Sequence, residues 1–227
     1  RSVINQLRSA LTTPAAGLDG PFTTLTELGL RTQADGTLSI DDATLNAALE
    51  DNFDSVAGVF ARSAAVADDA IRFEGATEDT QVGSYAVNVT QLATRGSLTG
   101  AAITAPVTIN AGNDTLSLEV DGVASGTINL TPGTFTSGEA LAAELQARIN
   151  GDSALAAAGV SVNVIFDAGS LQLRSNRFGS QSSVAVTAVD SNTTASLGLS
   201  VASGSDGVDV AGSIGGIQAV GNGQLLS

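Results

Sequence analysis

The chain has 227 residues, and its composition excludes most catalytic chemistries at once. It contains no cysteine and no histidine, which removes disulfides, thiolate metal sites, Ser-His-Asp and Cys-His groups and the commonest zinc ligand. Its 23 acidic residues outnumber 9 basic residues, all arginine, and the net charge of −14 disfavours nucleic acid and anionic membrane surfaces as partners.

The same composition indicates a folded, strand-rich protein. A chain of this length buries roughly 70% of its extended surface, so it can form a core without disulfides. Glycine, serine, threonine, alanine and valine dominate, which is typical of short strands joined by glycine turns. The sequence contains no run of 18 apolar residues, so no membrane span is predicted. We expect no enzyme activity and no cofactor. Because Arg1 already lies in a helical pattern, we also expect an internal fragment.

Residues 1–11 have the spacing of an amphipathic helix. Ile4, Leu7 and Leu11 fall on one face. This apolar stripe fits a core-facing helix and an inter-subunit or coiled-coil contact equally well, so we take the three residues as a candidate interface. Pro14 and the glycine-rich segment 17–21 then predict a loop.

Residues 28–40 have the pattern of a β-hairpin. Asp35-Gly36 predicts a tight turn, and Leu28 and Leu30 alternate on one side of it as Leu38 and Ile40 do on the other. The four aliphatic residues predict one buried face.

Two short helices are expected after the hairpin. Asp41 stands at the N-cap position of the first, in which Leu45 and Leu49 share a face. A second helix is predicted from Asn52, with an apolar stripe formed by Phe53, Val56 and Phe60.

Residues 62–81 are predicted to be an acidic linker that carries one edge strand at Ile71 and Phe73. Its acidic residues are Asp68, Asp69, Glu74, Glu78 and Asp79. Calcium is the alternative that such a cluster raises, but the spacing does not match an EF-hand loop, so a solvated connector is favoured.

Residues 82–213 are predicted to form a β-rich domain. Apolar alternation indicates strands around residues 85–89, 116–120, 160–166, 171–173 and 184–189. Turns are expected at 121–122 and 167–170. Thr136 and Glu139 resemble a capping box that opens a helix, and this helix carries Leu141, Leu145 and Ile149 and ends at Asn150-Gly151.

The predicted fold class is therefore α+β, mainly β: a small helix/hairpin/helix region followed by a β-rich domain with one packed helix. We expect a proximal region at 1–61, a linker at 62–81, an outer domain at 82–213 and a return segment at 214–227. Asp206 and Asp209 could in principle serve a carboxylate hydrolase, but the sequence offers no aromatic platform for sugar rings.

The sequence of the hairpin region resembles that of a known family. Leu28-Gly29-Leu30, then Asp35-Gly36-Thr37-Leu38, then Asp41-Asp42 and a helix ending in Val59-Phe60 are similar to the flagellar filament cap proteins, also called FliD or hook-associated protein 2. The helix at 1–11 matches the one that precedes the hairpin in that family.

The resemblance resumes in the β-rich domain. Residues 83–93 look like the strand that opens outer domains of cap proteins, residues 194–199 like the motif that closes them, and residues 210–216 with 221–226 like the returning segment. In short cap proteins the Val-Phe helix leads directly into the C-terminal helix. Here a β-rich domain follows it, as in longer family members.

The resemblance implies a structural, non-enzymatic component of the filament cap at the extracellular tip of a bacterial flagellum. It implies flagellin and other cap subunits as partners, in a homo-oligomer that assists flagellin folding and insertion. The alternative is a surface-exposed adhesive module that binds host glycans or mucin. Its only support is the surface position that the resemblance implies.

Overall fold

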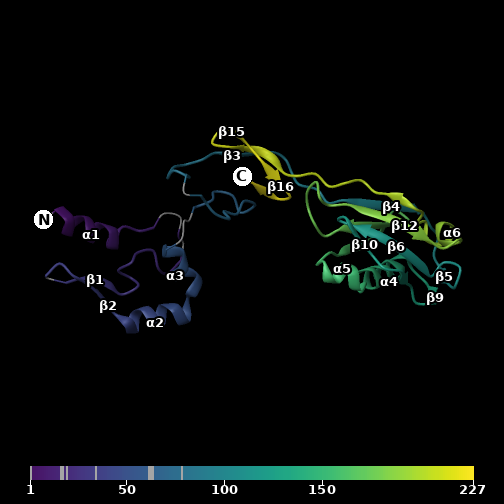
Figure 1. The fold of residues 1–227 in the computed structure, drawn as a ribbon, viewed down its shortest axis with the longest axis horizontal. Helices are drawn as coiled ribbons and strands as arrows, with labels where there is room; N and C mark the ends of the chain where they lie inside the picture. Colours follow the sequence, from purple (N-terminus) through teal and green to yellow (C-terminus); the bar gives the residue numbers. More distant parts are fainter. Residues whose placement is uncertain (1, 16–17, 19, 34, 61–63, 78) are drawn as a thin grey trace. The chain divides into compact units, whose positions relative to one another are not determined.

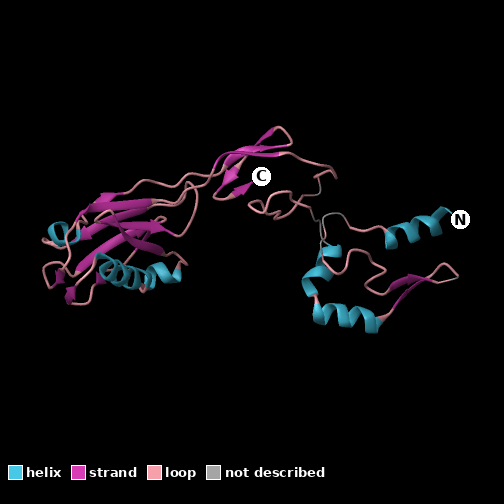
Figure 2. Cartoon of the chain, turned by 180° about the vertical axis from the view of Figure 1, so that it is seen from behind, coloured by secondary structure: helices cyan, strands magenta, loops and turns pink. Residues whose placement is uncertain are grey.

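The chain divides into two units, residues 1–82 and 83–227, in the computed structural model (Figure 1). The structure describes residues 2–15, 18, 20–33, 35–60, 64–77 and 79–227, and for residues 2–4 it describes the backbone alone. Antiparallel sheets dominate this part of the chain and helices are few, which confirms the α+β, mainly β prediction (Figure 2). Among the described helices, none has the length and apolar character that crossing a bilayer requires.

The first unit contains three helices and one hairpin within its described residues. Their bounds are α1 Ser2–Thr12, β1 Leu30–Thr32, β2 Leu38–Ile40, α2 Asp42–Asp51 and α3 Phe53–Phe60. Its small core consists of Leu28, Ala48 and Val56, against which partly buried apolar side chains such as Leu45 and Leu49 pack.

The predicted hairpin is confirmed, but half of its predicted buried face is not. Leu30 pairs with Ile40 and Thr32 pairs with Leu38, and the Asp35 carboxylate accepts a hydrogen bond from the amide of Thr37. Ala34 in the loop lies outside the described residues. Leu38 and Ile40 are 49% and 55% exposed, because the sheet has only two strands and none of the described elements of this unit covers that side of β2.

The first predicted helix after the hairpin is confirmed with its cap. The Thr44 amide donates to Asp41 Oδ1 over 3.2 Å, and this hydrogen bond is the main reason why the pKa of Asp41 is lowered. The predicted stripe of α3 is wrong in part, since Phe53 and Phe60 are each 65% exposed. Val56 and Val59 face the core instead, and at 100° per residue the two phenylalanines lie roughly 80° away from that direction.

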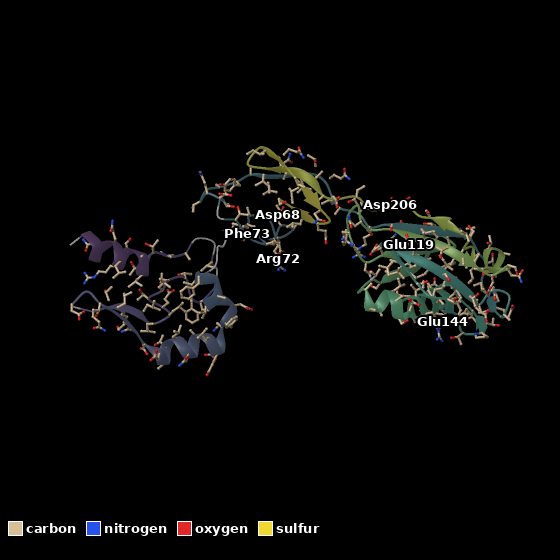
Figure 3. The ribbon with its side chains drawn as sticks, viewed as in Figure 1. Asp68, Arg72, Phe73, Glu119, Glu144 and Asp206 are labelled. Carbon is tan, nitrogen blue, oxygen red and sulfur yellow. The ribbon has the colours of Figure 1, made fainter. Side chains whose placement is uncertain are left out.

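The edge strand predicted at Ile71 and Phe73 is wrong. Residues 64–77 and 79–82 form no strand, and the Ile71 amide instead donates to the carbonyl of Asp68 in a turn. A strand needs a neighbouring strand to pair its backbone groups, and no described strand pairs with this segment. An exposed ion pair joins Arg72 to Glu74 over 2.9 Å, and Figure 3 labels Arg72 beside Asp68 and Phe73.

The second unit is built from antiparallel strands with three helices in its described residues. The strands before α4 are β3 Val87–Gln91, β4 Ser97–Ala102, β5 Val107–Ile109, β6 Thr115–Val120, β7 Val123–Ala124, β8 Ile128–Asn129 and β9 Gly133–Phe135. Then come α4 Gly138–Asn150, α5 Ser153–Ala157, β10 Val162–Asp167, β11 Ser170–Ser175, β12 Val184–Val189, α6 Thr193–Leu197, β13 Ala202–Ser203, β14 Ala211–Ile214, β15 Ile217–Ala219, β16 Gly221–Asn222 and β17 Leu225–Leu226.

Two sheets and α4 enclose the main core of this unit. One sheet has the order β10-β11-β4 and the other the order β13-β12-β6-β7, with β8 also paired to β6. The alternation predicted from the sequence is confirmed along these strands, where every second residue is buried: Leu116, Leu118, Val120, Val162, Val164, Leu171, Leu173, Val184 and Val186. Both predicted turns are confirmed as two-residue connections, at Asp121-Gly122 and Ala168-Gly169.

Helix α4 lies along β10, as Figure 1 shows, and its predicted apolar face is confirmed. Leu141, Leu145 and Ile149 are all fully buried. The predicted capping box is wrong by one residue, because Ser137 rather than Thr136 is the N-cap, and its hydroxyl accepts from the Ala140 amide over 3.2 Å.

Phe166 explains where α4 begins. A Cβ added to Gly138 would lie 2.3 Å from the Phe166 ring, so packing against β10 places the side-chain-free residue at the first helical position. With Ser137 as N-cap, Glu139 stands one position too early to close a capping box.

Substitution at Ser137 and at Thr136 shows which of the two residues is the N-cap of α4. We expect Ser137→Ala to lower the free energy of unfolding by about 1 kcal/mol, because the Ala140 amide loses its acceptor. The matched Thr136→Ala variant is expected to change it by less than about 0.5 kcal/mol. Urea denaturation followed by circular dichroism measures both. A larger loss of unfolding free energy for Thr136→Ala would favour the capping box predicted from the sequence.

Thr193 at the start of α6 is fully buried, and its hydroxyl has no hydrogen-bond partner among the described residues. Thr193→Val keeps the shape and removes the unpaired polar atom, so we expect it to leave stability unchanged or raise it by up to about 1 kcal/mol. The neighbouring hydroxyl of Thr194 donates to the Leu199 carbonyl over 3.1 Å, so Thr194→Val is the control and should destabilise. Thermal melts that give the opposite order would contradict the assignment.

A second, smaller group of strands lies in the same unit. We call β3, β14, β15, β16 and β17 the strand group; its sheet has the order β15-β14-β3, and β16 pairs with β17. The predicted strand near residues 85–89 is confirmed as β3, but every residue of β3 is exposed, so its predicted apolar face at Val87 and Val89 is uncovered.

Candidate functional site

The helix that carries the candidate interface is anchored to its own unit at its C-terminal end. The Leu11 carbonyl accepts hydrogen bonds from the amide of Thr26 over 3.2 Å and from the hydroxyl of Thr26 over 3.0 Å. Leu11 itself is only 4% exposed and Leu7 is half-buried. The Ile4 side chain lies outside the described residues. The structure therefore places Leu11 against its own unit.

The Glu27 carboxylate stabilises the turn against which the end of α1 packs. Glu27 Oε2 accepts from the amides of Thr23 and Thr24 over 2.7 and 2.9 Å, and these bonds lower the pKa of Glu27. The Ala15 amide donates to the Thr23 carbonyl over 2.8 Å, which ties the end of α1 to the same turn. The spacing of Thr24 and Glu27 is the sequence signal that could have located this turn, and the sequence reasoning missed it.

The hairpin is then joined to α2 through the backbone. The Asp41 amide donates to the Gly29 carbonyl over 3.0 Å, so the end of β2 returns to the residue that follows buried Leu28. This contact joins the hairpin to α2. It is the structural reason why the Leu28-Gly29-Leu30 and Asp41-Asp42 motifs occur together.

The first unit exposes apolar side chains that the sequence reasoning assigned to its interior. They are Leu38 and Ile40 on β2 and Phe53 and Phe60 on α3. A shallow hollow between the Phe22 loop and α2 is lined by Phe22, Ala43, Thr44, Ala47, Ala48, Asp51 and Asn52. Contiguous exposed apolar patches mark contact surfaces, whereas apolar side chains scattered singly are normal on a protein surface. We take these residues, together with the half-buried Leu7, as candidate contact residues of the unit.

The other two candidate carboxylates, Asp206 and Asp209, differ in their contacts. Asp209 Oδ1 accepts from the Ser180 amide and the Gly223 amide, whereas the Asp206 carboxylate, labelled in Figure 3, has no hydrogen bond or ion pair within the described residues. No group of three acidic side chains in the described ranges is arranged to hold a metal ion. Glu78 of the acidic linker lies outside those ranges.

Comparison with known proteins identifies a family over the first part of the chain. The family model described as "Flagellar hook-associated protein 2 C-terminus" matches residues 1–132. A curated relative, the A-type flagellar hook-associated protein 2 of Pseudomonas aeruginosa, is 37% identical over 60 residues. That match covers 26% of this chain and 12% of the relative, so the chain spans a small part of that protein's length.

Solved structures with similar backbones include FliD (HAP2) from Pseudomonas aeruginosa PAO1, at 22% identity and a TM-score of 0.41, covering 66% of this chain and 70% of that one. The D1-D2-D3 domains of the flagellar cap protein FliD from Escherichia coli are 17% identical, with a TM-score of 0.42 and coverage of 64% and 43%. FliD from Bdellovibrio bacteriovorus is 14% identical, with a TM-score of 0.40 and coverage of 64% and 80%.

The family model extends over more than half of the 227 residues. It includes α1, the hairpin, α2 and α3, which are the elements joined by the hydrogen bonds described above. The chain therefore belongs to the flagellar hook-associated protein 2 family, the FliD proteins of the flagellar filament cap.

Proposed function

We propose that this chain is a structural, non-catalytic part of a flagellar filament cap at the extracellular tip of the filament, where it assists flagellin folding and insertion. The family match over residues 1–132 is the observation that carries this proposal. The composition supports this proposal, because a chain without cysteine and histidine has few side chains suited to catalysis. Its abundant glycine, serine, threonine, alanine and valine suit a strand-rich scaffold instead.

The proposal assigns a task to each part of the chain. Residues 1–61 belong to the proximal region of the cap, 62–81 link it to the outer domain at 82–213, and residues 214–227 return toward a further part of the protein. Flagellin and other cap subunits are the proposed partners. Ile4 and Leu7 of the α1 stripe are proposed to contribute to subunit contacts in the full protein, together with the exposed apolar side chains of β2 and α3, whereas Leu11 packs within its own unit.

The structure gives the adhesive alternative no support. Binding of host glycans commonly uses exposed aromatic platforms, and Tyr85 is the single strongly exposed aromatic side chain in residues 83–227.

Deletion of the gene in the bacterium that encodes the chain tests the proposed function. We expect cells that lack filaments and release flagellin monomers into the medium, with filaments restored by the intact gene. A second complementing gene carries Leu38→Asp and Phe53→Asp, which place charges on exposed apolar positions without disturbing the buried Leu28 core. Normal filaments in the deletion strain would refute the proposal.

In isolation the chain is expected to be a monomer in dilute solution. The Leu11 end of α1 is already buried in its own unit, so the helix has lost part of the apolar face that would join a partner. A short helix also forms only marginally in water unless it packs on a neighbour. Light scattering over a dilution series measures this. A pentamer or hexamer that persists on dilution would show that elements within this chain carry assembly.

A further inference from the structure

The second unit contains a junction at which the chain passes twice between its two groups of strands. We call residues 94–207, which include both main sheets and α4, the outer body. The chain enters the outer body at Thr94 and leaves it at Val208, and the two passages pair: the Thr94 amide donates to the Val208 carbonyl over 2.9 Å, and the Val208 amide donates to the Thr94 hydroxyl over 3.1 Å.

One carboxylate joins the two groups across this junction. Asp209 Oδ1 accepts from the Ser180 amide over 3.0 Å and from the Gly223 amide over 2.7 Å. Ser180 lies in the loop between β11 and β12 of the outer body, and Gly223 lies in the turn between β16 and β17 of the strand group. The same oxygen therefore binds both groups at once.

The backbones around this oxygen approach more closely than side chains would allow. A Cβ added to Gly179, which has a φ of +98°, would lie 2.3 Å from Asp209 Oδ1 and 2.6 Å from the Gly223 Cα. A Cβ added to Gly207 would lie 2.4 Å from the Gly179 carbonyl oxygen. Glycine at position 179 leaves the room that the Asp209 carboxylate occupies, and glycine at position 207 lets the backbone pass close to that loop.

The charge state of Asp209 suits this role. The Ser180 hydroxyl, the Gly223 amide and the Ser180 amide all lower the pKa of Asp209, and the positive charge of Arg177 adds to the effect. A carboxylate whose pKa is below its ordinary value of about 4 is fully ionised at neutral pH. An ionised acceptor makes hydrogen bonds that are shorter and stronger than those of a neutral one.

We propose that Asp209 is a positioning residue that locks the orientation of the outer body on the strand group. Without its carboxylate, the 178–180 loop and the β16–β17 turn would meet mainly through glycine backbone, and the paired passages at Thr94 and Val208 would act as a hinge. The lock determines whether the outer domain projects rigidly, and this inference stands whether or not the proposed cap function is correct.

Distance measurement between two spin labels tests the lock directly. Because the chain has no cysteine, Ala147→Cys on the exposed side of α4 and Ile217→Cys on β15 introduce the only two labelling sites. In the otherwise unchanged chain of 227 residues, double electron–electron resonance is expected to give one narrow distance distribution. Asp209→Ala is expected to broaden it at least twofold, whereas Asp209→Asn, which keeps an acceptor oxygen, should remain close to the parent.

Asp206→Ala is the matched control. Asp206 lies three residues earlier in the same connection, and its carboxylate makes no hydrogen bond or ion pair with the described residues, so the distribution should stay narrow. An equally narrow distribution for Asp209→Ala would overturn the proposal, and so would equal broadening for Asp206→Ala.

Amide hydrogen exchange separates a lock from a general folding role. In Asp209→Ala the Ser180 and Gly223 amides are expected to exchange at least tenfold faster, because each loses its acceptor. The amides of Leu118 and Leu173 in the main sheets should keep their protection. Loss of protection throughout these sheets would show that Asp209 supports folding of the outer body, and the lock would then be refuted.

Discussion

Replacement of Leu118 by alanine is expected to lower the free energy of unfolding of the second unit by about 3–4 kcal/mol. Leu118 is fully buried at the centre of β6, where β12, β7 and β8 all pair with the same strand. The lost methyl groups remove transfer free energy, and the close packing of both sheets prevents the cavity from collapsing.

Leu92→Ala is the control for this substitution. The Leu92 side chain is 76% exposed, so the same chemical change there should cost less than about 0.5 kcal/mol. Denaturation in guanidinium chloride, followed by circular dichroism, compares the two variants with the parent. Similar losses for both variants would contradict the position of the core.

Gly198→Ala is expected to lower the free energy of unfolding by about 3 kcal/mol or more. Gly198 ends α6 with a φ of +69°, and its amide donates to the Thr194 carbonyl over 3.1 Å. An added Cβ would lie 2.2 Å from the Ala101 carbonyl oxygen, which belongs to the backbone of β4 and cannot rotate away. The left-handed conformation costs about 1–2 kcal/mol for alanine, and displacement of β4 adds to this cost.

Gly159→Ala isolates the backbone part of that effect, so the difference between the two variants is the steric part. Gly159 also has a φ of +69°, but an added Cβ there meets no atom within 4 Å. We expect a loss of about 1 kcal/mol from the backbone conformation alone. Thermal and chemical denaturation of both variants measure the difference, and equal losses would show that β4 can yield to the added methyl group.

The exposed apolar side chains bear on the proposed function. Phe53 and Phe60 on α3 and Leu38 and Ile40 on β2 leave the first unit with apolar surface that its own described residues do not cover. A cap subunit that contacts neighbours and exported flagellin would bury such surface in the assembly, as we propose for the full protein.

Local pattern was sufficient for most elements of the fold. Strict alternation along β6, β10, β11 and β12 predicted which residues face the core, because side chains of a strand point to opposite faces in turn. The four-residue spacing of Leu141, Leu145 and Ile149 predicted α4 for the corresponding reason. Composition by itself excluded histidine and cysteine chemistry, and the wording of residues 28–60 was enough to indicate the family that residues 1–132 match.

Tertiary structure decided which apolar faces are covered. Leu38, Phe53 and Val87 have the same local patterns as buried residues elsewhere, yet they are exposed, because burial depends on whether another element lies opposite them. The start of α4 was set by the Phe166 ring against Gly138, a contact across 28 positions of sequence that no local motif contains.

The candidate sites followed the same division. The stripe of Ile4, Leu7 and Leu11 could be predicted from spacing, but the burial of Leu11 depends on the turn at Thr26. The sequence singled out Asp209 only with Asp206, as carboxylates that a hydrolase could in principle use, and the two hydrogen-bond partners of Asp209 stand 29 and 14 residues away along the chain. The sequence alone determined periodicity, charge and family. The partners of Asp209 required the folded chain, because hydrogen bonds between distant loops form only after the strands have brought those loops together.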